Sequence, residues 1–359
     1  MSKVLLGDVS RERRETCKNN KVDYPIVGLE HLTPEEITLL SWDEGKDNTF
    51  SKIFHEGDIL FGRRRAYLKK AAVAPFDGIC SGDITVIEAL PDRILPELLP
   101  FIIQNDMLFD FAVGKSAGSL SPRVKWEHLR NYEFELPNMD KQRELAKILW
   151  SMDAAKKSYQ KLLKKTDELV KSQFMEQFKN TERVRLDVIA DIVMGQSPTS
   201  DSYNTDGQGM SFYQGSADFT KKYVKTRMYC TAPNRVAKAG DVLMSVRAPV
   251  GTVNLTDKEC CIGRGLAAIR SKKTPDYNDF LLYAFRVMED EIASMGQGST
   301  VLSINKDKLH GLQMPNAETQ QQEKFITFAQ QSDKSKFELE QALSELDATY
   351  KRIISENLG

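Results

Sequence analysis

The sequence predicts an α+β protein in which two similar strand-rich domains follow one another, each continued by a long helix. Two observations predict this architecture. Motifs in the first half of the chain return in the second half about 180 residues later, and an apolar heptad pattern follows the strand-rich part of each half. A chain of 359 residues is long enough for two or three domains that each bury a core.

Four features of the first half return in the second half in the same order. They are Gly57-Asp58-Ile59-Leu60 with Gly240-Asp241-Val242-Leu243, Gly118-Ser119 with Gly298-Ser299, Leu129 with Leu309, and Pro137-Asn138 with Pro315-Asn316. The displacements are 183, 180, 180 and 178 residues, so only small insertions separate the two copies. A duplication of this size implies two similar domains that can hold two unlike sites.

The first domain is expected over residues 1–141, with turns at Gly57-Asp58, Pro75 to Gly78 and Gly114 to Ser121. Apolar runs predict strands from Ile59 to Phe61 and within Ile79 to Ile87. Apolar residues between Pro96 and Phe111 can share one helical face, which predicts a single short helix there. The second domain is expected over residues 181–320.

Residues 142–180 and 321–359 are the expected long helices. Mostly apolar residues recur at alternating spacings of three and four in both. The first helix has Leu145, Ile148, Met152, Ala155, Tyr159, Leu162, Thr166 and Leu169 at these positions, and the second has Leu339, Leu343, Leu346, Tyr350, Ile353 and Asn357. This pattern favours two helices that pair as a coiled coil. An amphipathic helix that lies on its own domain is the alternative.

Chain geometry restricts the pairing. About 36 residues of helix span roughly 50 Å. The first helix leads into the second domain after a short link near residues 180–183, so a second helix that pairs with it must run back, antiparallel to the first. The sequence therefore predicts a rod with one domain near each end and an approximate two-fold axis.

Composition excludes several classes of protein. The chain has 28% charged residues and a net charge of −1, and no apolar run approaches the ~18 residues that cross a bilayer. The N-terminus carries no signal-peptide pattern, and the five cysteines show no CxxC or metal-type spacing. We therefore expect a cytoplasmic protein with free thiols and no membrane association.

The sequence does not single out a catalytic site. It contains no GxxxxGK[ST] loop and no HExxH, and the GxGxxA match at Gly263 to Ala268 is not followed by a predicted helix. An enzyme of unrecognised type with a duplicated fold remains one hypothesis. Any turnover by the purified chain would support it.

Binding signals are stronger, and arginine carries most of them. Arg64 and Arg247 lie six residues past the two Gly-Asp turns, and arginine can donate bidentate hydrogen bonds to guanine or phosphate. Matched small-residue loops could contact phosphate or be purely structural turns, and the glutamine of a Gly-Gln-Ser-Pro turn could read adenine or cap the turn. The candidate DNA-contacting residues are Arg63, Arg64, Arg65, Lys69, Lys115, Ser116, Gln196, Ser197, Lys221, Lys222, Arg247, Arg264, Gln297 and Ser299. Ordinary solvated charge is the alternative for each basic cluster.

The second half carries the clearest family resemblance. Met194 to Pro198, Tyr203-Asn204, Tyr213 to Gly215, Gly240 to Gly251 and Ile262 to Gly265 together resemble the specificity subunit of Type I restriction–modification enzymes. The likeness covers the whole chain. The first half departs from it, because Cys17 to Asn20 replaces the Gly-Gln-Ser-Pro turn and Gly82-Asp83 stands where Arg264-Gly265 stands.

The resemblance implies a division of labour. Each domain would read one half of a bipartite double-stranded DNA site. The helices would set the gap between the half-sites and dock two adenine-N6 methyltransferase subunits, which bring S-adenosylmethionine. Restriction subunits that use ATP and Mg²⁺ would join them, and this chain would bind no cofactor and perform no chemistry. A coiled-coil adaptor that binds only proteins is the alternative.

Overall fold

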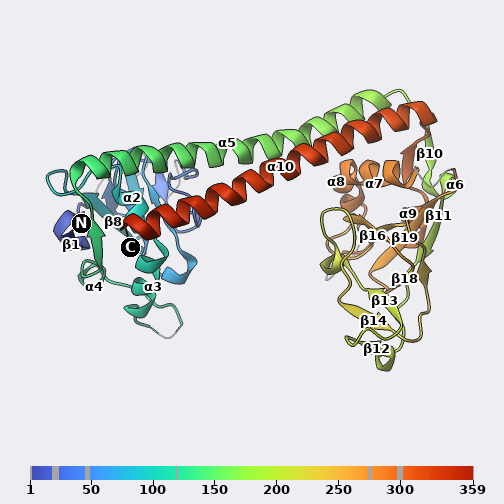
Figure 1. Cartoon of the computed structure of the whole chain (residues 1–359), viewed down its shortest axis with the longest axis horizontal. Helices are drawn as coiled ribbons and strands as arrows, with labels where there is room; N and C mark the ends of the chain where they lie inside the picture. Colours follow the sequence, from blue (N-terminus) through green and yellow to red (C-terminus); the bar gives the residue numbers. More distant parts are fainter. Residues whose placement is uncertain are drawn as a thin grey trace. The chain divides into compact units, whose positions relative to one another are not determined.

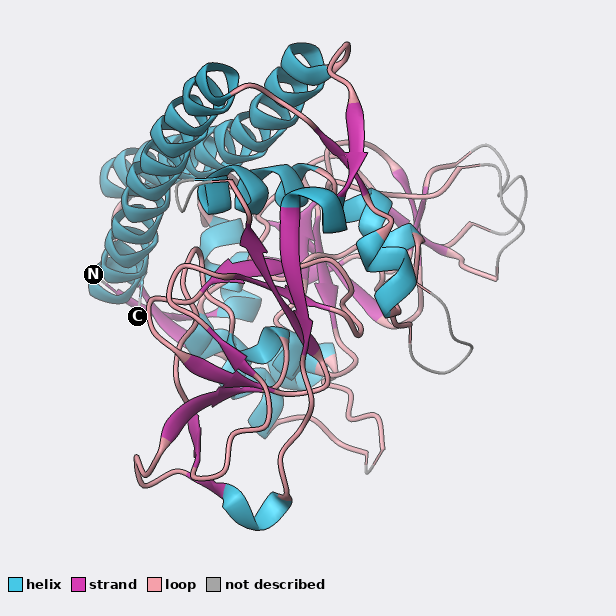
Figure 2. Ribbon diagram, turned by 90° about the vertical axis from the view of Figure 1, so that its right-hand side faces the viewer, coloured by secondary structure: helices cyan, strands magenta, loops and turns pink. Residues whose placement is uncertain are grey.

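The computed structural model describes residues 2–17, 24–44, 49–118, 120–273, 277–296 and 302–358. The chain divides into unit 1, which comprises Met1–Lys161 and Glu340–Gly359, and unit 2, which comprises Leu162–Leu339. Each unit combines β-sheets with helices (Figure 1, Figure 2). The α+β class expected from the sequence is confirmed.

Unit 1 contains a four-stranded antiparallel sheet and a three-stranded mixed sheet. The first has, in order, β2 (Ser10–Glu12), β8 (Ile84–Ala89), β5 (Ile59–Gly62) and β6 (Ala71–Val73). The second has β3 (Ile26–Val27), β7 (Gly78–Cys80) and β4 (Lys52–Phe54), with β3 parallel to β7. A separate antiparallel pair joins β1 (Ser2–Leu5) to β9 (Glu133–Leu136).

Strand β5 shows how a short apolar run supplies two layers of the core. Ile59 and Phe61 pack into the cluster that contains the helices of unit 1. Leu60 between them packs with Val27 and Phe54 of the three-stranded sheet. Successive side chains of a strand point to opposite faces, so a strand covered on both faces is apolar throughout. The strand expected after the Gly57-Asp58 turn is thereby confirmed.

Apart from the two long helices, the helices described in unit 1 are short. They are α1 (Leu6–Val9), the 3₁₀ turn η2 (Ala66–Leu68), α2 (Leu99–Ile103), α3 (Asp106–Gly114) and α4 (Trp126–Leu129). The single helix expected between Pro96 and Phe111 is wrong, because α2 and α3 are separate helices. Asn105 lies between them, and its side chain accepts a hydrogen bond from the backbone N–H of Met107 at 3.0 Å. Asparagine favours such a capping position, so it starts a new helix at this point.

Unit 2 has the same plan. Its four-stranded sheet has, in order, β11 (Ala190–Met194), β19 (Leu266–Ser271), β16 (Val242–Ser245) and β17 (Val253–Leu255). Its second sheet has β12 (Tyr203–Asn204), β14 (Met228–Cys230), β13 (Met210–Tyr213), β18 (Cys260–Ile262) and β15 (Val236–Ala237), with β13 parallel to β18, and β10 (Arg183–Arg185) pairs with β20 (Gln313–Pro315). The helices are α6 (Leu186–Ile189), α7 (Tyr277–Val287), α8 (Glu289–Ser294) and α9 (Lys306–His310), with 3₁₀ turns η3 (Ser200–Ser202) and η4 (Ser216–Asp218).

Strand pairing confirms the duplication. Leu60 of β5 faces Val86 of β8 in unit 1. The corresponding residue of unit 2, Leu243 of β16, faces Ala268 of β19. The glycines of the two Gly-Asp turns, Gly57 and Gly240, have φ angles of 88° and 84°. Glycine tolerates this left-handed conformation because it has no Cβ, which explains its presence in both copies.

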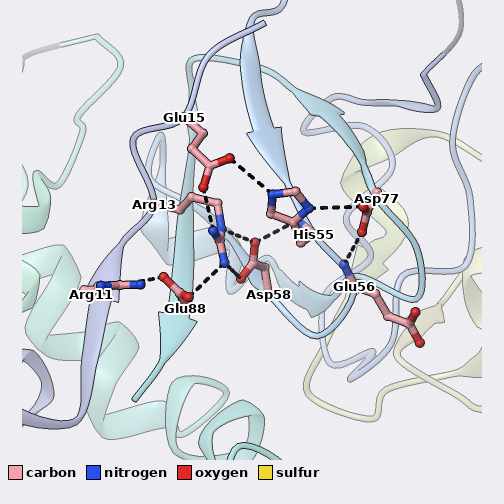
Figure 3. Close-up of polar contacts among 8 residues, drawn as sticks. All are labelled: Arg11, Arg13, Glu15, His55, Glu56, Asp58, Asp77 and Glu88. Carbon is pink, nitrogen blue, oxygen red and sulfur yellow. Dashed lines mark hydrogen bonds and ion pairs between the residues drawn. The ribbon is translucent and has the colours of Figure 1, made fainter. Parts of the chain in front are cut away.

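A buried carboxylate fixes the Gly-Asp turn in each unit. Asp58 accepts the backbone N–H of His55 at 2.8 Å, and Asp241 accepts that of Lys238 at 2.8 Å. Arg13 donates its Nε–H to Asp58 at 2.7 Å (Figure 3). Arg270 does the same for Asp241 at 2.7 Å. The turn is therefore shared, but the arginine that neutralises the aspartate directly follows β2 in unit 1 and lies within β19 in unit 2.

The two units use different arginines because one pair of facing residues in the sheet carries opposite charges in the two units. In unit 1 Arg11 of β2 faces Glu88 of β8, and in unit 2 Asp191 of β11 faces Arg270 of β19. Glu88 cannot neutralise an aspartate, so Arg13 reaches Asp58 and Glu88 together. Arg270 reaches Asp241 directly.

The long helices α5 (Met139–Phe178) and α10 (Thr319–Leu358) have 40 residues each. In unit 1, Leu149 of α5 shares a core with Leu358 of α10, and Lys156 Nζ lies 3.4 Å from Asp347 Oδ1. In unit 2, Gln177 of α5 donates to the carbonyl oxygen of Gln321 of α10 at 2.6 Å. Within each unit, later residues of one helix meet earlier residues of the other, so the expected antiparallel pairing is confirmed.

The heptad positions expected on α5 are partly wrong. Ile148, Leu162 and Leu169 are 38%, 48% and 54% exposed. The start of the helix also packs on its own domain, where Trp150 donates its Nε1–H to the carbonyl oxygen of Glu97 at 2.9 Å. The helix thus combines the two arrangements weighed from the sequence. In unit 2 Leu163 and Val170 are half-buried where Leu162 and Leu169 were expected, so the buried face is displaced by one residue there.

Among the described residues, no helix is both long enough and apolar enough to span a bilayer. Cys80, Cys230, Cys260 and Cys261 are buried free thiols, as expected. Burial raises the pKa of Cys80 and of Cys260 to about 12, so both stay protonated at neutral pH.

Candidate functional site

The segment after strand β5 meets the loop after helix α3 at one end of unit 1. Arg64 forms a β-bridge with Arg123, and Arg65 donates its backbone N–H to the carbonyl oxygen of Pro122 at 2.8 Å. Unit 2 repeats this contact, since Arg247 forms a β-bridge with Ser303. Arg64 and Arg247 therefore occupy equivalent places next to the same loop in their two units.

In unit 1 this end carries a cluster of two arginines around one carboxylate. Arg123 donates from Nε to Asp83 Oδ1 at 2.7 Å, and Arg64 donates from Nη1 to Asp83 Oδ2 at 3.3 Å. Arg64 also donates from Nε to Ser121 Oγ at 2.9 Å. Hydrogen bonding from Arg123 lowers the pKa of Asp83, with a further contribution from Arg64, so the cluster keeps its negative centre at neutral pH.

Arg65 and Lys69 bracket the turn η2 in an unusual backbone conformation. Their φ angles are 54° and 51°, which places two non-glycine residues in the left-handed region. Such residues cost about 1–3 kcal/mol each and are common at functional sites. The side chain of Arg65 is exposed and makes no hydrogen bond or ion pair within the described residues. Lys69 donates to Asp106 at 2.5 Å, and this bond raises the pKa of Lys69.

Arg63 differs from its neighbours because it turns away from them. Its Nε is buried and has no hydrogen-bond partner within the described residues. The side chain lines a polar hollow of about 530 Å³ together with Arg14, Lys125 and His128. Arg63 is thus the one residue of the Arg63-Arg64-Arg65 run that borders this hollow.

The loop after α3 holds the other two candidates of unit 1. Ser116 donates its hydroxyl to the carbonyl oxygen of Ala112 at 2.8 Å, which satisfies a carbonyl near the end of α3. Lys115 is exposed, and its Nζ lies 5.7 Å from the ring centroid of Phe111. Lys115 can still reach a ligand, whereas the hydroxyl proton of Ser116 is already engaged.

In unit 2 the turns recognised in the sequence come together. Gly195 donates its backbone N–H to the carbonyl oxygen of Leu266 at 2.9 Å, and a Cβ on Gly195 would lie 2.1 Å from the carbonyl oxygen of Gly263. A Cβ on Gly265 would lie 2.3 Å from the carbonyl oxygen of Gln214. Glycine is required at both positions because backbone approaches backbone directly.

This packing presents polar side chains on its outer side. Gln196 is exposed, while its backbone N–H bonds the carbonyl oxygen of Ile262 at 3.1 Å. Ser197 Oγ accepts the backbone N–H of Arg264 at 3.3 Å. The turn is therefore fixed by main-chain bonds, which leaves the amide of Gln196 available.

Arg247 and Arg264 are the arginines of this end of unit 2, and both are exposed. Within the described residues, neither side chain makes an ion pair or hydrogen bond. The residue equivalent to Asp83 of unit 1 is Gly265, which has no carboxylate. The same end of the fold therefore carries arginines held by an acid in unit 1 and arginines without one in unit 2.

The remaining candidates lie elsewhere. Lys222 Nζ is 3.4 Å from Asp279 of α7, and Lys221 Nζ lies 5.5 Å from the ring centroid of Phe337 of α10. The structure thus sets these lysines against helices and joins them to neither Arg247 nor Arg264. Gln297 and Ser299 lie outside the described residues.

Sequence reasoning missed Asp83 and Arg123 as members of the site. Arg123 follows the small-residue loop directly and falls at the place of Ser303 in the repeat, a signal that could have identified it. Asp83 offered no comparable signal, since its role depends on contacts with residues 19 and 40 positions away. Within the described part of the chain, no group of three or more His, Cys, Asp or Glu residues could hold a metal ion.

A single family model matches both halves of the repeat. The family model for the Type I restriction modification DNA specificity domain matches residues 4–166 and 179–346. The putative type I restriction enzyme MjaX specificity subunit of Methanocaldococcus jannaschii is 28% identical over 335 residues, which cover 84% of this chain and 78% of that protein.

Solved structures resemble the whole chain. One, from work on complex assembly and conformational transition of the type I R-M system, is 30% identical with a TM-score of 0.69 and covers 99% of this chain and 97% of that chain. The Type I restriction–modification S subunit from M. genitalium has a TM-score of 0.60 at 13% identity and covers 100% and 96% of the two chains, so it supports the fold alone.

Proposed function

Since the chain belongs to the Type I restriction modification DNA specificity family, we propose that unit 1 and unit 2 each read one half of a bipartite double-stranded DNA site. The chain is a sequence-specific DNA-recognition subunit of a Type I restriction–modification system. Recognition takes place at one end of each unit. In unit 1 this is where Arg64 pairs with Arg123, and in unit 2 where Arg247 pairs with Ser303.

The exposure of Arg247 and Arg264 is the observation that carries this placement. Neither guanidinium group has a carboxylate partner in the described chain, and a main-chain hydrogen bond joins their sequence neighbours Val246 and Gly265. An exposed guanidinium offers five N–H donors in a planar fork that fits the major-groove edge of guanine or a phosphate. Gln196 adds an amide that fits adenine.

The helices α5 and α10 serve as the spacer and as the docking surface for two methyltransferase subunits in this proposal. Their length supports it, because helices of 40 residues exceed what either domain needs for its own core. Restriction subunits complete the assembly. S-adenosylmethionine, ATP and Mg²⁺ belong to those partners, while this chain binds none of them and acts without chemistry of its own in the cytoplasm.

The test is selection of DNA by the full chain assembled with its methyltransferase subunits. Duplexes with random sequence are bound at several salt concentrations, since phosphate contacts alone give salt-dependent affinity without preference. We expect an enriched bipartite motif. Binding of protein partners without any sequence preference would favour the adaptor and overturn the proposal.

Arg247→Ala tests the placement in the same assay, with Arg185→Ala as its matched control. Arg185 is similarly exposed, but it pairs with Asp187 at 2.6 Å on a different part of unit 2. Only the first substitution should change selection of the second half-site. Equal effects of both substitutions would argue against the proposed site.

A further inference from the structure

Unit 1 contains a cluster in which Arg64 and Arg123 both bond Asp83, and the described residues of unit 2 contain no counterpart of it. We propose that these three residues read one G·C base pair in the half-site of unit 1, with arginine donating to guanine and Asp83 accepting from the cytosine amino group. This inference rests on the proposed function and names part of its specificity.

The cluster keeps unused hydrogen-bonding capacity. Arg64 commits Nε to Ser121 and Nη1 to Asp83, and its Nη2 has no partner within the described residues. Arg123 commits Nε and Nη2 to Asp83 and leaves Nη1 unused in the same sense. A carboxylate has about four acceptor positions, so Asp83 retains one after three bonds.

This pattern fits the edge of a G·C pair. In the major groove guanine offers the acceptors N7 and O6, and cytosine offers the N4 amino donor beside them. Guanidinium donors next to a free carboxylate acceptor complement that arrangement. The bonds to Ser121 and Asp83 hold the guanidinium groups in place before DNA arrives, which reduces the entropy lost on binding.

Asp83 also argues against two simpler roles. A site built for phosphate would be weakened by a negative charge at its centre, since like charges repel. A role in stability alone is poorly served by this pairing, because the side chains of Arg64 and Arg123 are 39% and 44% exposed and exposed ion pairs contribute little to folding.

The second unit supports the assignment by contrast. In unit 2, Gly265 takes the place of Asp83. Arg247 and Arg264 therefore lack a neighbouring carboxylate that would accept from cytosine. Two units with one scaffold and different polar groups at the same end should read different base pairs. The carboxylate is thus a difference in specificity between otherwise equivalent ends.

The experiment compares duplex libraries selected by the full chain with its methyltransferase subunits, carrying Asp83→Ala, Asp83→Asn, Arg123→Ala or Arg123→Lys. We expect each variant to lose discrimination at one G·C pair of the first half-site by roughly tenfold or more and to leave the second half-site unchanged. Of the two Arg123 variants, Arg123→Lys should keep more of the overall affinity because it keeps the charge, although it loses the planar fork that discriminates the base.

Arg11→Ala is the matched control, since Arg11 is an exposed arginine of unit 1 whose Nε lies 2.6 Å from Glu88 outside the cluster. Unfolding temperatures of all variants exclude loss of structure, and the near-isosteric Asp83→Asn serves if Asp83→Ala unfolds. Equal loss on every sequence, or an unchanged preference, would overturn the inference. Failure of the proposed function is distinct, because the unmodified chain would then select no motif.

Discussion

Val246 donates its backbone N–H to the carbonyl oxygen of Gly265 at 2.9 Å, and Arg247 and Arg264 are sequence neighbours of these two bonded residues. The two arginines are 17 positions apart in the sequence, yet Arg247 lies two residues after β16 and Arg264 lies two residues before β19, and these two strands pair. Under the proposed function, a DNA duplex contacts both arginines at this end of unit 2.

Replacing Arg247 or Arg264 by alanine should weaken DNA binding by about 1–3 kcal/mol. If the side chain reads a base, the loss is concentrated on one position of the second half-site. If it contacts phosphate, the loss is equal on all sequences and the salt dependence becomes shallower. Competition binding with single-base variants of the selected site distinguishes the two, and an unchanged affinity for both variants would remove these residues from the interface.

Adding a Cβ at Gly195 or Gly265 should destabilise unit 2 by about 1–3 kcal/mol, because the new methyl group would meet a backbone carbonyl oxygen at 2.1 or 2.3 Å. Urea unfolding of Gly195→Ala and Gly265→Ala measures the change. Gly215→Ala is the control, since no heavy atom lies within 4 Å of its Cβ position. Stability equal to that of the control would contradict the close packing of these turns.

Removing the buried carboxylate Asp241 should destabilise the protein by about 3–5 kcal/mol, because Arg270 loses its partner and Lys238 loses an acceptor for its backbone N–H. The exposed ion pair of Asp290 with Lys171 in the same unit provides the comparison. Asp290→Ala should leave the denaturation midpoint unchanged. A similar midpoint for both variants would show that Asp241 does not fix its turn.

His55 should make the stability of unit 1 depend on pH. Its ring lies 3.1 Å from Asp77 and 3.2 Å from Glu15 (Figure 3), and hydrogen bonds first to Asp77 and then to Glu15 raise the pKa of His55 above its ordinary value of 6.5. The protonated ring therefore stabilises the folded chain fully below pH 6.5, and this contribution is lost as pH rises through the higher folded pKa.

Denaturation midpoints measured across this pH window should fall with rising pH more steeply in the unmodified chain than in His55→Gln. Asp77→Asn removes the first partner and should reduce the slope as well. The same lowering of stability in all three proteins over the window would contradict a role for His55.

Lengthening the paired helices should change the gap between half-sites. Seven residues add about 10 Å of helix, which corresponds to about three base pairs at 3.4 Å each. Inserting one heptad into α5 after Lys161 and one into α10 before Glu340 keeps the antiparallel pairing. Selection from random duplexes should return the same half-sites with a longer gap, and an unchanged gap would show that the helices are not the spacer.

Much of the architecture could be predicted from local patterns. The Gly-Asp turns were predicted from a motif that recurs in both halves, and the long helices from apolar residues at alternating spacings of three and four. The left-handed φ angles of Gly57 and Gly240 explain why glycine recurs there. The register on α5 could not be predicted, because Trp150 bonds Glu97 of its own domain while neighbouring residues meet α10. Helical spacing alone does not say which of two partners a face will meet.

The sequence by itself determined the duplication, the α+β class, the antiparallel helices and the family. These depend on order and periodicity, which are properties of a linear chain. Only the tertiary structure decided that Asp83 bonds both Arg64 and Arg123, and that Lys222 faces Asp279 instead of joining the arginines. It also decided that Arg13 and Arg270 bond equivalent aspartates from non-equivalent positions. Charge pairing depends on distances between residues far apart in the chain, and folding sets those distances.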